Sequence, residues 1–319
     1  MGQHVIIGAG AVGSALAAEL DARGEEVLVV SRRGTKPPGQ QVRAARCDAS
    51  DAAALAALTT RAAAIYDCAN PPYHRWTTDW PPIASSILSA AQRSGAVLVT
   101  LANVYAYGPI DHPMTEADPL AARSAKGQVR AQMWRDALAA HEAGLVRATE
   151  VRASDFYGPG VTDGGYLGER VVPRLLAGKS VSFLGDPDLD HSLTYVPDVA
   201  VALATVATDA RAWGRPWHVP TARAGSLRQA VEGLADAAGV PMVTVRTLPW
   251  WMVRAAGVFS TQLRELPEIA YQFDSPFILD STSFTETFGL RATEPSVAYE
   301  ATVRWWRDRV TTGAALSTT

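Results

Sequence analysis

The chain has little lysine and little asparagine. Among its 319 residues, lysine occurs only as Lys36, Lys126 and Lys179, and asparagine only as Asn70 and Asn103. A codon bias explains both scarcities in general, so each copy that is present is a candidate for a specific role. Basic residues number 29 against 32 acidic ones, and this balance excludes the polycationic surface that binds nucleic acid or anionic lipid.

Cysteine and long apolar runs are also scarce. Cys47 and Cys68 are the only cysteines, and their spacing fits neither a metal site nor a disulfide framework, although one bridge between them stays an alternative. No apolar run approaches the roughly 18 residues of a membrane span, and the MGQH start offers no signal segment. We therefore expect a cytoplasmic protein with no metal, no membrane and no nucleic acid partner.

Hydrophobic residues, at 48%, suffice for a full core, and in the first half of the chain they alternate between strand and helix patterns. Such alternation predicts a parallel sheet covered on both faces, a doubly wound α/β fold that binds nucleotides. The expected strands are HVIIG, EVLVVS, QVRAARCD, RAAAIYDCAN and AVLVTLAN, and the expected helices are 11–24, 50–61 with Ser50 or Asp51 as its cap, and 83–95.

The pattern loosens after residue 157. GPGVTDGGYLGER indicates a loop, VVPRLLAGKS and LRQAVEGLADAAG indicate helices, VSFLG and WHVP indicate strands, and HSLTYVPDVAVALATVATDA indicates a strand followed by a helix that Asp198 caps. We expect a cofactor domain of residues 1–157 with 191–220 contributing, a smaller, discontinuous C-terminal substrate lobe of 158–190 and 221–311, and a frayed tail at 312–319.

The sequence G-A-G-A-V-G lies between the first strand and the first helix. It comprises Gly8, Gly10, Ala11, Val12 and Gly13, in the context that a dinucleotide fingerprint requires. The first glycine permits a tight turn, the second lets the backbone approach a pyrophosphate, and the third lets helix and strand pack closely. The phosphates would lie at the positive end of the helix. A tight turn without a ligand is the alternative.

The second expected strand ends in Ser31, Arg32 and Arg33, where an NAD-selective site would have a carboxylate. A serine and a guanidinium can bind the 2′-phosphate that a carboxylate would repel, so we expect NADP(H) rather than NAD(H). Two solvated arginines at a strand end are the alternative. Asp48 follows the third strand, where it would meet the adenine ring or, alternatively, cap the next helix.

With these elements, the chain resembles the epimerase/dehydratase-like branch of the extended short-chain dehydrogenase/reductase superfamily. The resemblance rests on IIGAGAVG, the C-D-A-S-D turn, VYAYG, RASDFYGPG and HSLTYVPDVA, and it covers most of the chain. It implies a Rossmann domain that binds the cofactor and a C-terminal substrate lobe. The family commonly has GxxGxxG, and its first glycine corresponds here to Ile7.

The resemblance also identifies catalytic positions at which this chain departs from the family. Members have Ser or Thr five residues before the VYG glycine, and counting back from Gly108 gives Asn103. They have a YxxxK pair on the next helix, in which Lys holds the nicotinamide ribose. Lys126 matches that lysine, but Ala122 stands at the tyrosine position, so the usual proton donor is missing. A solvated charge at a helix start is the alternative role of Lys126.

Ala69 and Asn70 are expected to bind the cofactor, and further polar residues are candidates to contact the substrate. Asn70, beside Ala69, and Asn103 end neighbouring strands at the edge where ligands bind, although turn-forming hydrogen bonds explain both equally. Tyr105 lies where related dehydratases place a working Glu, and its phenol could donate a proton with Lys126 nearby. A place in the wall of the pocket is the alternative role of Tyr105. Tyr107 and Tyr157 match family tyrosines that are usually structural or line the pocket.

One further position in the sequence bears on the identity of the substrate. Seven residues before Asp198 the family often has an Arg that grips the diphosphate of a nucleotide sugar, and here the residue is His191. A neutral imidazole is a poor diphosphate clamp, so a nucleotide sugar is disfavoured. Tyr73, Trp76, Trp80 and LPWWMV suggest an aromatic wall, or a buried aromatic core.

These features predict an NADP(H)-dependent reductase of a small organic molecule, which would be a carbonyl compound, a conjugated alkene or an imine. Asn103 and Tyr105 would contact the substrate oxygen, and Lys126 would hold the cofactor. The alternatives are a redox-neutral epimerase, dehydratase or cyclase that retains its cofactor, and a sensor that binds NADP without catalysis. A homodimer is a possible assembly.

Overall fold

The computed structural model describes residues 2–162, 165–258 and 264–317. The chain divides into two compact units. Unit 1 comprises Met1–Gly108, Thr115–Ala153 and Val199–Val219, and unit 2 comprises Pro109–Met114, Ser154–Asp198 and Pro220–Thr319. The N-terminal part of unit 1 therefore ends at Ala153, whereas the expected cofactor domain ended its first part at residue 157. Residues 191–198, which were expected to contribute to the cofactor domain, belong to unit 2.

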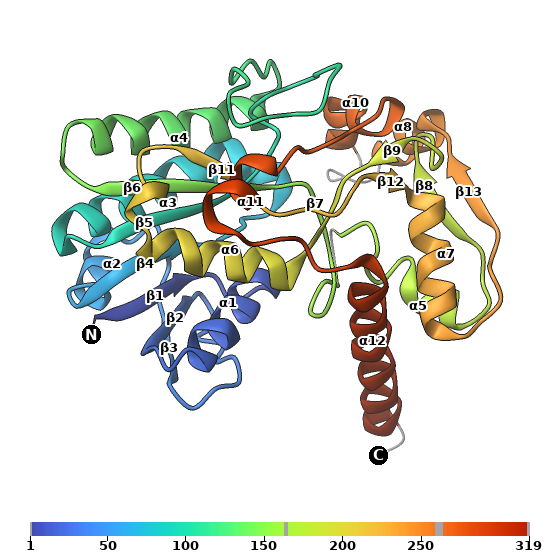
Figure 1. Cartoon of the computed structure of the whole chain (residues 1–319), viewed down its shortest axis with the longest axis horizontal. Helices are drawn as coiled ribbons and strands as arrows, with labels where there is room; N and C mark the ends of the chain where they lie inside the picture. Colours follow the sequence, from blue (N-terminus) through green and yellow to red (C-terminus); the bar gives the residue numbers. More distant parts are fainter. Residues whose placement is uncertain (1, 163–164, 259–263, 318–319) are drawn as a thin grey trace. The chain divides into compact units, whose positions relative to one another are not determined.

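Unit 1 is built on a seven-stranded sheet whose order is β11-β6-β5-β4-β1-β2-β3 (Figure 1). Every neighbouring pair is parallel, which confirms the doubly wound α/β fold. The strands are β1 Gln3–Ile7, β2 Val27–Ser31, β3 Val42–Arg46, β4 Ala62–Asp67, β5 Val97–Asn103, β6 Arg147–Ala153 and β11 Pro216–His218. The chain runs outward from β1 to β3 and then returns to β4 on the other side of β1, so the switch point lies between β1 and β4.

Helices cover both faces of this sheet. In Figure 1, α3 and α4 lie on one face of the sheet, with α2 beside α3, whereas α1 and α6 lie on the other. Leu16 and Leu20 of α1, Leu55 of α2 and Ile87 of α3 are at most 1% exposed, so each of these three helices buries an apolar face. The bounds are α1 Ala11–Ala22, α2 Ala52–Leu58, α3 Trp76–Ser94, α4 Ala125–Glu142 and α6 Val196–Thr208.

Helix α3 begins at Trp76, seven residues before the expected start at residue 83. The expected helix begins after Pro81 and Pro82, because proline removes a backbone donor and disfavours a helix interior. In the structure both prolines lie inside α3. Trp76 and Trp80, one turn apart, are 4% and 0% exposed, and the burial of two indoles on one face offsets the lost backbone hydrogen bonds.

The side chains that cap the helices differ in part from expectation. Asp51, rather than Ser50, caps α2 by accepting a hydrogen bond from the Ala54 amide. Asp198 lies within the first turn of α6, and its carboxylate accepts hydrogen bonds from the backbone amide and hydroxyl of Thr293 instead of capping that helix. The expectation that Asp198 caps α6 was therefore wrong.

Unit 2 has its own hydrophobic core around α5, α7 and α12. Its helices are α5 Val172–Leu176, α7 Leu227–Ala238, α8 Trp250–Gly257, α10 Tyr271–Asp274, α11 Thr282–Phe288 and α12 Pro295–Ser317, and its paired strands are β7 Asp155–Tyr157 with β10 Leu193–Tyr195, β9 Asp190–His191 with β12 Gly225–Ser226, and β8 Val181–Leu184 with β13 Val245–Leu248. Ser226 and Gln229 form a complete capping box at the start of α7.

Two further expectations concern the tail and the cysteines. Helix α12 continues through residues 312–317, because no proline interrupts it, so the expected frayed tail is helical there. Residues 318–319 lie outside the described part of the chain. Cys47 and Cys68 are free thiols. Within the described residues, no helix has the length and apolar character needed to cross a membrane.

Candidate functional site

The glycine loop after β1 has the geometry of a phosphate cradle. Gly8 has φ of +111°, and a Cβ there would lie 2.4 Å from the Cys68 carbonyl oxygen. A Cβ on Gly13 would lie 2.0 Å from the Gly8 oxygen, so α1 packs directly on the turn. Gly10 has no protein atom within 4 Å of its Cβ position, and it begins α1 without a side-chain cap. The uncapped amides, with Ala11 and Val12 in the first turn, therefore fit a pyrophosphate.

The residues after β2 form an exposed turn. The Ser31 hydroxyl accepts a hydrogen bond from the Thr35 amide, and Arg32 and Arg33 are both exposed. Asp48 accepts hydrogen bonds from the amide and hydroxyl of Ser50, which lower the pKa of its carboxyl, and the nearby Arg32 lowers that pKa further. Asp48 does not cap α2, because Asp51 does.

The two asparagines lie on adjacent strands at the same edge of the sheet. Asp67 of β4 pairs with Thr100 of β5, and each asparagine follows three residues later, so both come at the carboxyl ends. The contact between Gly8 and the backbone of Cys68 and Ala69 joins this edge to the glycine loop. Asn103 Oδ1 accepts a hydrogen bond from the Tyr105 amide at 3.3 Å. This is a turn-forming hydrogen bond, the alternative role expected for Asn103.

An aromatic cluster of unit 1 contains Trp76, Trp80 and Met133, with Ala69, Tyr73 and Tyr105 among the residues packed against it. The ring of Tyr105 lies 5.9 Å from that of Trp76, and Trp76 lies 5.2 Å from Tyr73. Lys126, only 3% exposed, places Nζ 4.4 Å from the centre of the Tyr73 ring. The structure thus brings Ala69, Tyr105 and Lys126 into one neighbourhood, as expected from their positions in the sequence.

Lys126 and Ala122 are not one helical turn apart. Helix α4 begins at Ala125 with Ser124 as its cap, so Lys126 is in its first turn and Ala122 lies in the preceding loop. The Ala122 amide donates to the Ala106 carbonyl, and a Cβ on Gly127 would lie 2.5 Å from the Ala122 methyl group. The Ala122 methyl group therefore lies against Gly127 in the first turn of α4.

Tyr107 is a structural anchor. Its phenol oxygen accepts a hydrogen bond from Arg152 Nη1 at 2.7 Å and lies 2.7 Å from Nε2 of His218. Burial raises the pKa of Tyr107 to about 12, so the phenol stays protonated. These bonds hold the turn that carries Tyr105.

A buried polar row, which was not predicted from the sequence, crosses the centre of the sheet. Asp67, Thr100 and Glu150 face one another on β4, β5 and β6 and are 2%, 7% and 2% exposed. Arg152 pairs with Glu150 at 2.7 Å, and Arg130 of α4 interacts electrostatically with both carboxylates. Burial raises the pKa of Asp67 to about 6 and also raises that of Glu150.

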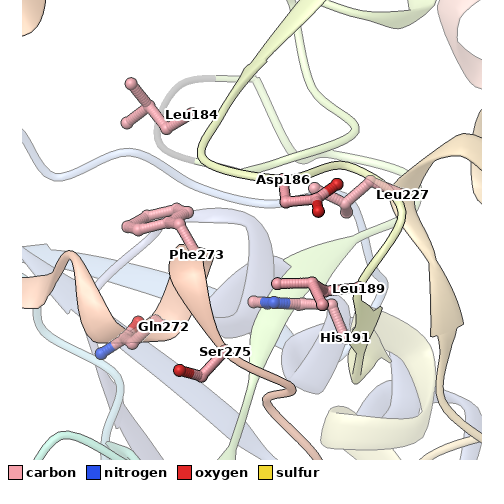
Figure 2. Close-up of a pocket in the computed structure, with 8 residues that line it drawn as sticks. All are labelled: Leu184, Asp186, Leu189, His191, Leu227, Gln272, Phe273 and Ser275. Carbon is pink, nitrogen blue, oxygen red and sulfur yellow. The ribbon is translucent and has the colours of Figure 1, made fainter. Parts of the chain in front are cut away.

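In unit 2, His191 is paired with a carboxylate. Its Nε2 lies 2.7 Å from Asp155 Oδ2, and its ring is 5.1 Å from that of Tyr166 and 5.2 Å from that of Phe277. His191 lines a cavity of about 10 Å³, and Figure 2 draws the residues that surround it. The cavity is also lined by Leu184, Asp186, Leu189, Leu227, Gln272, Phe273 and Ser275. Tyr157 packs against Tyr195 and Tyr299 in the same unit.

A model of the NAD dependent epimerase/dehydratase family matches residues 5–219. This segment contains the glycine loop, both asparagines, Tyr105, Lys126 and His191. It confirms the resemblance drawn from the motifs. No curated protein matches the chain.

Several solved structures share the fold. MoeE5 in complex with UDP-glucose and NAD is 22% identical, with a TM-score of 0.79 over 97% of this chain and 100% of that one. DesIV of Streptomyces venezuelae, a dTDP-glucose 4,6-dehydratase with NAD bound, is 20% identical, with a TM-score of 0.76 over 96% and 97%. The UDP-glucose 4-epimerase of Thermus thermophilus, a complex with NAD, is 19% identical, with a TM-score of 0.77 over 96% and 99%.

The different surroundings of Gly10 and Gly13 generate a paired prediction. Gly10→Ala should leave the melting temperature unchanged, because its methyl group meets no protein atom, yet weaken dinucleotide binding about tenfold or more by holding the phosphates off the helix amides. Gly13→Ala should lower the melting temperature as well, because its methyl group collides with the Gly8 oxygen. Thermal melts and calorimetric titration with NADH and NADPH measure both effects. Unchanged dinucleotide affinity in Gly10→Ala would contradict the cradle.

Proposed function

The chain belongs to the NAD dependent epimerase/dehydratase family, and on that premise we propose that it is an enzyme that uses a bound nicotinamide dinucleotide in a redox-neutral reaction. The substrate would be a small organic molecule with a hydroxyl or carbonyl group and no nucleoside diphosphate. The family assignment supports this reaction type better than the net reduction predicted from the motifs.

The observation that carries the proposal is the position of Tyr105. Its phenol packs in the same aromatic cluster as Tyr73, over whose ring Lys126 lies, and Gly127, the residue after Lys126, abuts the Tyr105 carbonyl. A phenol beside buried cations can give a proton and take it back. Redox-neutral epimerisation and dehydration both require such a reversible proton transfer.

Each residue would have a separate role at the sheet edge. When bound, the dinucleotide supplies the acceptor and the donor of a hydride. Lys126 would hold the nicotinamide ribose, the Asn103 amide nitrogen would donate to the substrate oxygen, and Tyr105 would exchange the proton. Asn103 fits a donor role because its local turn uses only Oδ1.

The buried cations also select among substrate classes. Lys126 and Arg130 are 3% and 6% exposed, and positive charge near the reacting atoms stabilises an oxygen that becomes negative. The same charge disfavours an iminium substrate. We therefore favour carbonyl chemistry over the imine chemistry that the sequence also allowed.

His191 supports a substrate without a diphosphate. The Asp155 carboxylate lies 2.7 Å from the imidazole and would repel a phosphate that approached it. The Tyr166 and Phe277 rings beside His191 likewise do not supply the paired N–H donors with which an arginine binds a diphosphate.

Net reduction is the second candidate, and Ala122 favours it. With no hydroxyl at position 122, the usual base for oxidising an alcohol is missing. Delivery of hydride to a conjugated carbonyl demands less of an acid, because donors such as Asn103 can stabilise the enolate.

Cofactor preference is a separate proposal. The family and its solved relatives are described with NAD, whereas Ser31, Arg32 and Arg33 favour a 2′-phosphate and no carboxylate ends β2. Asp48 opposes that preference through its charge near Arg32. We propose that the two arginines prevail and that NADP(H) binds more tightly than NAD(H).

Turnover tests the reaction type. Purified enzyme with bound cofactor should convert a hydroxy ketone or free sugar, chosen from a panel of both, in many turnovers without net change in reduced nicotinamide absorbance. Tyr105→Phe should lower kcat by about 10² to 10⁴ and leave cofactor affinity unchanged, whereas Tyr299→Phe, which removes a hydroxyl elsewhere in the chain, should have no effect. Consumption of one reduced cofactor per product would support net reduction instead.

Titration with both cofactors tests the preference. NADPH should bind more tightly than NADH, and Arg32→Asp combined with Arg33→Asp should reverse the ratio of their dissociation constants by about tenfold or more. Arg61→Asp combined with Arg93→Asp is a matched control, because it makes the same change of charge at two exposed arginines, one in the turn before β4 and one in the last turn of α3. Tighter binding of NADH by the unaltered protein would contradict the proposal.

A further inference from the structure

Arg130 is a buried cation whose contacts are mostly aromatic. It is 6% exposed, and its guanidinium carbon lies 4.7 Å from the Trp76 ring centre and 4.2 Å from that of Trp80. Nη1 donates to the Leu101 carbonyl at 3.4 Å, while Nε has no hydrogen-bond partner among the described residues. A guanidinium that is removed from water and incompletely hydrogen-bonded acts mainly through its charge.

Charges on three elements face this guanidinium. Asp67 at the end of β4 and Glu150 on β6 interact with it most strongly, and Tyr105 after β5 interacts with it as well. Glu150 is already paired with Arg152 at 2.7 Å. Two buried carboxylates thus balance two buried guanidinium groups, and little of the Arg130 charge is cancelled by a direct ion pair.

Tyr105 is joined to Arg130 by geometry as well as by charge. Both side chains contact Trp76, whose ring is shared between the guanidinium and the phenol ring. Leu101, which accepts the hydrogen bond from Arg130, lies four residues before Tyr105, near the end of β5. Lys126, the other buried cation of the cluster, lies over the Tyr73 ring.

We propose that Arg130 is a positioning residue that acts through Tyr105: its charge, held on the Trp76 and Trp80 rings, stabilises the phenolate and so makes this phenol the proton-exchanging group of the site. The inference rests on the proposed function for its role in catalysis. In this arrangement the Arg130 guanidinium, one helical turn beyond Lys126, supplies the positive charge that lets the Tyr105 phenol exchange a proton in place of the family's usual tyrosine.

The first test follows Tyr105 ionisation without substrate or cofactor. The chain with 13C-labelled tyrosine is titrated by NMR, and the Tyr105 signal is identified by its loss in Tyr105→Phe. Arg130→Met should raise the midpoint of Tyr105 ionisation by about one pH unit or more, and Arg130→Lys should raise it less, because lysine keeps the charge. Arg93→Met, the same change at an exposed arginine in the last turn of α3, should not move it.

Because carboxylates lie near Arg130, the test also needs variants in which Asp67 is replaced. Arg130→Met alone leaves Asp67 without its cation, which can prevent folding. In Asp67→Asn, the side chain can still accept the hydrogen bond from the Ala69 amide, and adding Arg130→Met removes both members of the charge pair. The midpoint in the double variant should then lie above that in Asp67→Asn alone. Equal midpoints in these folded proteins would overturn the proposal.

The pH profile of kcat separates this inference from the proposed function. If both hold, the limb assigned to Tyr105 should move to higher pH in Arg130→Met, in parallel with the NMR midpoint. A shift of the NMR midpoint together with full activity of Tyr105→Phe would leave the electrostatic link intact and refute the catalytic role of Tyr105. An unmoved NMR midpoint would refute the role of Arg130 whatever the activity.

Discussion

The structure at the carboxyl ends of the central strands depends on a set of buried charged side chains. Asp67 and Glu150 occupy one row of the sheet with Thr100 between them, and Arg130 and Arg152 supply the balancing positive charges. Burying one of these groups without its partners would cost several kcal/mol, so the four groups must be retained together. Asp67 also accepts a hydrogen bond from the Ala69 amide and thereby shapes the turn next to the glycine loop.

The chemistry at this edge differs from that of the family in a coherent way. The chain keeps the phosphate cradle and the buried Lys126, but the position of the usual tyrosine is filled by the small Ala122 against Gly127. A phenol is instead available at Tyr105, on a turn that Tyr107 anchors through Arg152 and His218. In our proposal, proton transfer at this edge therefore comes from the turn after β5 and not from the segment that leads into α4.

The sequence predicted those parts of the site that depend on local pattern. The roles of Gly8, Gly10 and Gly13 follow from their spacing between a strand and a helix, and the structure has the close contacts and the open face that these roles require. The common edge of Asn70 and Asn103 follows from parallel strands. The start of α3 at Trp76 was not predicted, because Pro81 and Pro82 indicated a helix that begins after them, and the burial of Trp76 and Trp80 on one helix face was not anticipated.

The remaining features depend on contacts between residues far apart in the chain. The row of Asp67, Thr100 and Glu150 requires the strand order and register, and nothing in the local sequence around Arg130 indicates that two carboxylates face it. The pairing of His191 with Asp155 likewise joins two short strands of unit 2. Asp67 and Thr100, polar residues within two neighbouring expected strands, were the available signal.

The most direct test of the account is a crystal structure of the chain with a nicotinamide dinucleotide. We expect the pyrophosphate to lie against Gly10 and the first amides of α1, the ribose within hydrogen-bond distance of Lys126 Nζ, and the Tyr105 phenol facing C4 of the nicotinamide ring. A phenol that points away from C4, or a ribose that Lys126 does not touch, would contradict it.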